Sequence, residues 1–249
     1  MNRRLIGSVL GAGVSVALAL VLPAAFPEDA GFAQLCVLMA LQETLLVGLP
    51  AFLLMLRSSS STERLKSLWA KPSAYQGGLV MLMAVAFTLV SVLITVIFLM
   101  LLESFGIKPP EGMTLVPENA QQLLIAALCA TLIPAVAEEL LFRGVIQGGL
   151  SARFNPRIGI WASALLFALL HRSVLAFPQM LAIGMVLGGL RAFSGGLWLP
   201  IIFHAFYNFA VLALNYTRTA PSLGMMLFCV AVFIVAYRLL MKEEVNNAG

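Results

Sequence analysis

Residues 75–102 read YQGGLVMLMAVAFTLVSVLITVIFLMLL and contain no charged side chain. About 20 apolar residues suffice for a helix to cross the hydrocarbon core of a bilayer, so this run is long enough. It lacks the regular apolar and polar alternation of a barrel strand. Because backbone groups in lipid must be hydrogen-bonded within the protein, the run predicts a membrane-spanning helix.

The composition extends this prediction to the rest of the chain. Of its 249 residues, 61% are hydrophobic and 10% are charged, whereas a soluble domain carries about 25% charged residues. We therefore expect one all-α domain over residues 1–249, built as a polytopic membrane bundle of about eight helices. The predicted helices are 5–26, 33–56, 75–102, 120–142, 158–172, 174–193, 198–215 and 221–241.

The loop charges predict an orientation in the membrane. If both termini are cytoplasmic, the inside segments hold Arg3, Arg4, Arg57, Arg64, Lys66, Lys71, Arg153, Arg157, Arg191, Arg238 and Lys242, and the outside segments hold Lys108, Arg172 and Arg218. Such an excess of inside cations favours cytoplasmic termini in the cell's inner or plasma membrane. The cations form no patch interleaved with aromatic residues, so we expect no nucleic-acid partner. The oligomeric state stays open.

The fourth predicted helix carries charges that need an explanation. Each ionised side chain at the bilayer centre costs about 2.5 to 3.5 kcal/mol. Glu139 and Arg143 are four residues apart and share a face, so we expect them to pair. Glu138 lies about 100° round the helix and is free to point into a pocket as a general base. A structural ion cluster, or interfacial charges at a helix end, explains this segment equally well.

The two histidines of the chain, His171 and His204, both lie in apolar stretches. A single membrane histidine is often hydrogen-bonded to a neighbouring helix and nothing more. Here, however, His204 and Asn208 are one helical turn apart, so both can offer N–H donors to a single oxygen. Such a pair is a plausible clamp for an oxyanion.

Three of these stretches, in order, resemble the motifs of the CPBP intramembrane protease family, which includes the CAAX prenyl endopeptidases of type II and the bacteriocin-processing, Abi-like proteins. The match consists of EExxxR at Glu138, Glu139 and Arg143, FxxxH at Phe167 and His171, and HxxxN at His204 and Asn208. The resemblance places a catalytic core at about 120–215.

The resemblance implies an all-helical endopeptidase that hydrolyses a peptide bond in or beside the membrane. It implies that Glu138 is the general base and that His171 orients the water. It implies that His204 and Asn208 bind the oxyanion. Glu139 and Arg143 would pair to support the site, and Phe167 would pack against it. The substrate would be a membrane-associated peptide or a lipidated protein. Whether it is prenylated stays open.

We expect no cofactor. The alternative is zinc held by Glu138, His171 and His204, since carboxylates and imidazoles are zinc ligands. The HExxH motif of many zinc proteases is absent from the sequence.

Two other functions fit parts of the pattern. A non-catalytic immunity or chaperone-like membrane factor could keep the same fold and motifs. A proton-coupled transporter could use buried Glu and His residues, but no paired repeats with interrupted helices are visible. Among the remaining residues, we interpret Glu43 as an interhelical hydrogen-bonding group, and Gly184 and Gly188 as a close-packing GxxxG motif.

The predicted boundaries contain one conflict. A fourth helix that ends at residue 142 puts Glu138 near the cytoplasmic end of its helix. A fifth helix over 158–172 puts His171 near the outer end of its own. We expect a tilted, kinked or recessed fifth helix to bring the two side chains to one depth.

Overall fold

The computed structural model describes residues 30–58, 66–108 and 115–247, and throughout these ranges the chain is helical without strands. The predicted helix 5–26 lies outside them. The helices are α2 (Phe32–Gln42), η2 (Glu43–Gly48), α3 (Leu49–Ser58), α5 (Ala74–Ser104), α6 (Ala120–Ala126), η3 (Ala127–Leu132), α7 (Ile133–Glu139), η4 (Leu140–Gln147), α8 (Gly148–Arg153), α9 (Pro156–Leu170), α10 (Phe177–Ser194), α11 (Trp198–Thr217) and α12 (Leu223–Asn247). The prediction of a polytopic helix bundle is confirmed.

Several helices join end to end into rods that can cross a membrane. The rods that are long and apolar enough are Phe32–Arg57, Ala74–Ser104, Ala120–Arg153, Trp198–Thr217 and Leu223–Glu243. Large apolar side chains such as Leu45, Ile97 and Phe228 point outward and are exposed. An apolar exterior of this extent marks a surface covered by lipid. The chain is thus an integral membrane protein, while its orientation stays a prediction.

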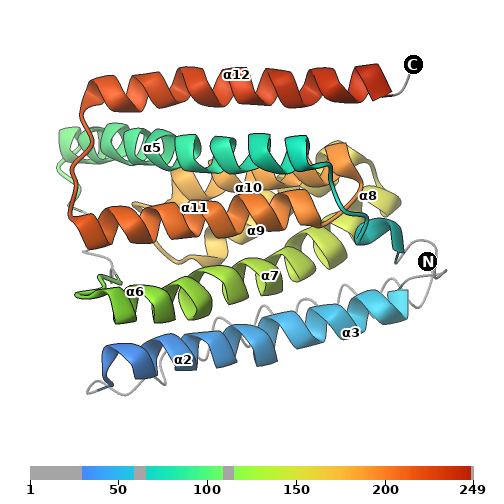
Figure 1. The fold of residues 1–249 in the computed structure, drawn as a ribbon, viewed down its shortest axis with the longest axis horizontal. Coiled ribbons are helices and arrows are strands. Elements are labelled where there is room, and N and C mark those ends of the chain that lie inside the picture. The colour runs from blue at the N-terminus through green and yellow to red at the C-terminus, as the bar shows by residue number, and fades with distance from the viewer. Residues whose placement is uncertain (1–29, 59–65, 109–114, 248–249) are drawn as a thin grey trace.

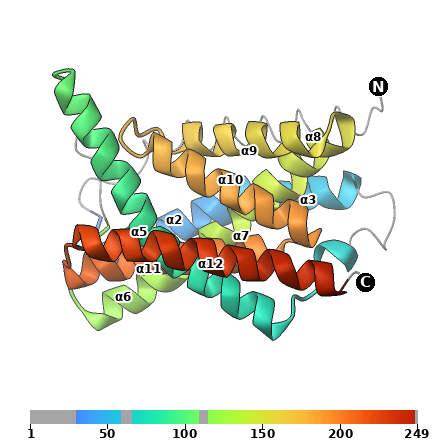
Figure 2. The same cartoon turned by 90° about the horizontal axis from the view of Figure 1, so that it is seen from above.

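The rods pack side by side in layers. Figure 1 shows α5 and α12 on one side and α2–α3 on the other, with α11 and α6–α8 between them. Seen from above, α8 and α9 lie opposite α11 and α12, and α5 runs obliquely across the bundle (Figure 2). Contacts between α5 and α12, α9 and α10, η2 and α7, and α7 and α11 agree with this order. The three segments that carry the motifs therefore lie together.

Two of the π-helical stretches are followed closely by a proline, one in the rod Phe32–Arg57 and one in the rod Ala120–Arg153 that carries Glu138. Each stretch ends two residues before a proline: η2 ends at Gly48, before Pro50, and η3 ends at Leu132, before Pro134. Proline has no N–H to donate, and its ring clashes with the carbonyl four residues earlier. A widened turn before the proline relieves that clash, and π-helical turns often occur at functional sites.

The fourth helix does not end at residue 142 as predicted. It continues through η4 and α8 to Arg153, because Arg143 and Gln147 donate inside the bundle to the carbonyls of Gly184 and Gly188. Glu138 is therefore about 22 Å from the end of its rod. The distance along α9 from Pro156 to His171 is also about 22 Å. The extension brings the two side chains to one depth and removes the conflict in the predicted boundaries.

The GxxxG glycines on α10 allow the close helix packing that the sequence predicts. A Cβ at Gly184 would lie 2.9 Å from the Cα of Ala164 on α9, and one at Gly188 would lie 3.0 Å from Ile160 Cγ2. Backbone atoms cannot move aside as a flexible side chain can. The packing of α10 on α9 therefore depends most strongly on Gly184.

Replacing Gly184 by Ala is expected to destabilise the protein by about 1 to 3 kcal/mol, because the new methyl group overpacks against Ala164. The matched control is Gly189→Ala on the same helix, where a Cβ would meet no atom within 4 Å. Thermal unfolding of the purified proteins in detergent compares the two. An unfolding midpoint for Gly184→Ala at or above that of Gly189→Ala would contradict the prediction.

Candidate active site

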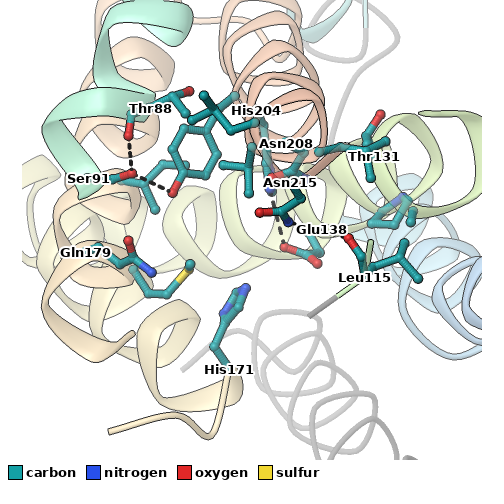
Figure 3. A pocket seen from close by; sticks show the side chains of 18 of the residues that line it. Thr88, Ser91, Leu115, Thr131, Glu138, His171, Gln179, His204, Asn208 and Asn215 are labelled. Atoms are coloured by element: carbon teal, nitrogen blue, oxygen red, sulfur yellow. Dashed lines mark hydrogen bonds and ion pairs between the residues drawn. The ribbon is translucent and has the colours of Figure 1, made fainter. Parts of the chain in front are cut away.

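A cavity of about 1180 Å³ opens among the central helices, and the predicted catalytic side chains line it. Glu138 reaches it from α7, His204 and Asn208 from α11, and His171 from the end of α9 (Figure 3). Glu43 lines the same cavity from the first residue of η2. Residues that are far apart in the sequence therefore meet around one space.

The base of the site is a buried ion pair. Arg143 Nη1 lies 2.9 Å from Glu139 Oε1, and both side chains are completely buried. Arg143 Nη2 also donates to the carbonyl of Gly184 at 3.1 Å. The expected pairing of Glu139 with Arg143 is present. It satisfies most of the polar groups of two charges that would be costly in lipid if unpaired.

His204 connects the two glutamates. Its Nδ1 lies 2.9 Å from Glu139 Oε1, and its Nε2 lies 3.8 Å from Glu138 Oε2. An ionised carboxylate only accepts hydrogen bonds, so Nδ1 carries a proton. The ring is thereby fixed by Glu139, with Nε2 on the side of Glu138 and the cavity.

The orientation of His171 is set by the backbone of its own helix. Its Nδ1 lies 2.8 Å from the carbonyl oxygen of Phe167. Since a carbonyl can only accept, Nδ1 is the protonated nitrogen and Nε2 of the neutral ring keeps its lone pair. Figure 3 shows the His171 ring pointing into the cavity toward Glu138.

Phe167 does more than the packing that the resemblance implies. Its ring centroid lies 4.9 Å from Arg143 Cζ, 4.6 Å from the His171 ring centroid and 5.7 Å from the His204 ring centroid. A guanidinium over an aromatic face is stabilised by the negative charge of that face. Phe167 thus separates the buried ion pair from the cavity and supports both imidazoles.

Glu138 is the carboxylate that the cavity can use. Its side chain is 17% exposed and lines the cavity. Glu139 is instead fully buried and engaged by Arg143 and His204. The difference between the two adjacent glutamates follows from their positions on different faces of α7.

The opposite wall contains polar residues that the sequence reading did not single out. Thr88 and Ser91 on α5 and Gln179 on α10 line the cavity, and Tyr207 donates to Ser91 Oγ at 3.2 Å. A single Ser or Thr in an apolar helix usually donates to its own backbone, as Thr88 does to Ala84. Such isolated hydroxyls therefore gave no clear sequence signal.

The donor set predicted for zinc is not gathered into a metal site. Within the described ranges, no three His, Cys, Asp or Glu side chains form a group that could hold a metal ion. One imidazole nitrogen of each histidine is already engaged, by Glu139 and by the Phe167 carbonyl. Metal dependence stays a prediction to be tested.

Comparison with known proteins gives two matches. Residues 120–210 match the family model described as type II CAAX prenyl endopeptidase Rce1-like. A segment of 78 residues is 38% identical to the uncharacterized protein YpbD of Bacillus subtilis (strain 168), which is 30% of this chain and 37% of that protein. The chain thus matches little more than a third of this relative's length. The residues matched by the family model contain all three motifs, and the match is consistent with the resemblance to the CPBP family that the motifs indicate.

Proposed function

We propose that the chain is an intramembrane endopeptidase that hydrolyses a peptide bond of a membrane-associated or lipidated substrate with a water activated by Glu138. The observation that carries this proposal is the convergence of Glu138, His171, His204 and Asn208 on one cavity. The match to a family of CAAX-type proteases supports the same reaction class.

In the first step, the Glu138 carboxylate takes a proton from water while the water oxygen attacks the carbonyl carbon of the substrate. The lone pair on His171 Nε2 accepts a hydrogen bond from that water and orients it. The carbonyl oxygen becomes an oxyanion. Glu138 then passes its proton to the amine nitrogen as the C–N bond breaks, which restores the carboxylate.

The oxyanion needs donors that are in place before it forms. Asn208 supplies its side-chain amide, and His204 supplies Nε2–H when the ring is protonated. The carboxylates of Glu138 and Glu139 and the guanidinium of Arg143 together carry one excess negative charge. A protonated His204 between Glu138 and Glu139 balances that charge, which supports its role as a donor.

The experiment that tests the proposal is substrate trapping. Wild-type protein and the Glu138→Gln variant are each expressed in cell membranes, and newly formed peptide termini are identified by mass spectrometry. We expect new termini with the wild type, none with the variant, and intact substrate co-purifying with the variant. Identical termini with both proteins would refute the proposal, as would a wild type that produces none.

Asn208→Ala is expected to lower kcat by about 100- to 1000-fold with a small change in KM, because an oxyanion donor acts mainly in the transition state. Steady-state cleavage in proteoliposomes measures this. Asn215→Ala is the matched control, because Asn215 lines the same cavity about two turns further along the same helix. A loss confined to KM would argue for a substrate-binding role instead.

A further inference from the structure

Glu43 is an acidic cavity residue that the proposed mechanism does not use. It lies within the membrane span Phe32–Arg57, at the first residue of η2. The sequence predicts an interhelical hydrogen bond for it. Instead, Glu43 lines the cavity, and its Oε2 is buried without a hydrogen-bond partner in the part of the chain that the structure describes.

The packing of η2 fixes Glu43 beside Glu138. A Cβ added to Gly48, at the end of η2, would lie 3.1 Å from the Cβ of Ala137, the residue before Glu138. This close approach holds η2 against α7. The carboxyl groups of Glu43 and Glu138 are near enough to interact electrostatically.

The carboxyl groups of Glu43 and Glu138 are near each other but do not hydrogen-bond to each other. Oε2 of each is buried, and neither has a hydrogen-bond partner among the described residues. Each side chain is nevertheless partly exposed and lines the cavity, so one water there can contact both carboxyl groups. The cavity that both groups line is the space in which the hydrolytic water must lie.

Electrostatics assigns different forms to the two groups. Two carboxylates that share a site of low dielectric do not both ionise readily, so one keeps a proton. Of the other charged or titratable groups around them, Glu139 and Arg143 pair with each other, and His204 contacts Glu138 and Glu139. His171, Tyr207 and Arg218 also line the cavity. Since His204 and Arg143 lie on the Glu138 side, Glu138 is the ionised member and Glu43 the neutral one.

We propose that Glu43 is a further catalytic residue, whose neutral carboxyl group holds the hydrolytic water against Glu138. The proposal rests on the proposed function. In the hydrolysis step, one hydrogen of the water goes to Glu138 and the other is hydrogen-bonded to His171 Nε2. The O–H of Glu43 donates to one lone pair of the water oxygen, and the second lone pair attacks the substrate carbonyl. Glu43 keeps its own proton throughout and needs no further reactant.

The first test compares Glu43→Gln, which keeps a neutral hydrogen-bonding group, with Glu43→Leu, which does not. We expect Glu43→Leu to lower kcat by about 10- to 100-fold and Glu43→Gln to stay within about threefold of the wild type, both with little change in KM. Thr44→Val is the matched control, because Thr44 is exposed on the outer face of the same turn. Wild-type kcat in Glu43→Leu, or equal losses in both variants, would overturn the proposal.

The second test does not depend on cleavage. Dicyclohexylcarbodiimide reacts with protonated carboxyl groups in apolar surroundings, and mass spectrometry locates the adduct. We expect an adduct on Glu43 and none on Glu138, and slower formation of the Glu43 adduct in Glu138→Gln, where the neighbouring negative charge is gone but Glu43 stays buried. An adduct on Glu138 in place of Glu43, or labelling of Glu43 unchanged by Glu138→Gln, would overturn the proposal. If the adducts are as expected but the wild type cleaves nothing, the proposed function fails, and with it the catalytic role of Glu43.

Discussion

Glu138→Gln is expected to lower kcat by about 100- to 10,000-fold, because glutamine keeps the shape of the side chain but cannot take a proton from water. The measurement is single-turnover cleavage in proteoliposomes with the substrate identified by trapping. The matched control is Glu103→Gln, which removes an exposed carboxylate at the end of α5. Both variants should insert and unfold like the wild type. Cleavage by Glu138→Gln at the rate of Glu103→Gln would contradict the role of Glu138.

The surroundings of the two adjacent glutamates explain why the largest loss of rate is expected at Glu138. Glu139 has no exposed surface, and its Oε1 is shared by Arg143 and His204. It cannot approach a substrate in the cavity. The Glu138 side chain is 17% exposed and lines the cavity. One residue of helical rotation therefore separates a reactive carboxylate from a structural one.

Patterns within a single helix predicted much of this arrangement. The predicted helix 75–102 compares with Ala74–Ser104, and 198–215 with Trp198–Thr217. These ranges follow from apolar runs, which a membrane permits only as helices or barrel strands. The pairing of Glu139 with Arg143 was predictable because four residues make one helical turn.

Features that depend on contacts between helices were not predictable in this way. The fourth helix passes residue 142 because partners on α10 satisfy Arg143 and Gln147, and those partners are backbone carbonyls that have no sequence signature. Glu43 reaches the cavity through the packing of η2 on α7, and its only signal in the sequence was an acidic residue within an apolar run. Contacts between helices therefore decide where the fourth helix ends and whether Glu43 faces the cavity.

The second large effect is expected at Arg143. Arg143→Met should destabilise the fold by about 3 to 5 kcal/mol, because it leaves the buried Glu139 carboxylate without its cation. The exposed cation Arg153, at the end of α8, provides the control variant Arg153→Met, which should have little effect. The measurement is the free energy of unfolding in mixed detergent micelles.

The double variant Glu139→Gln with Arg143→Met separates the cost of an unpaired charge from the loss of a favourable contact. Glutamine removes the charge but keeps an oxygen that can accept from His204 Nδ1, and methionine fills much of the volume left by the guanidinium. If the cost arises from the unpaired carboxylate, the double variant should recover most of the stability lost in Arg143→Met. If the double variant is no more stable than Arg143→Met alone, the loss comes from the contacts of Arg143 with Gly184 and Phe167, and the ion pair is not what stabilises the base of the site.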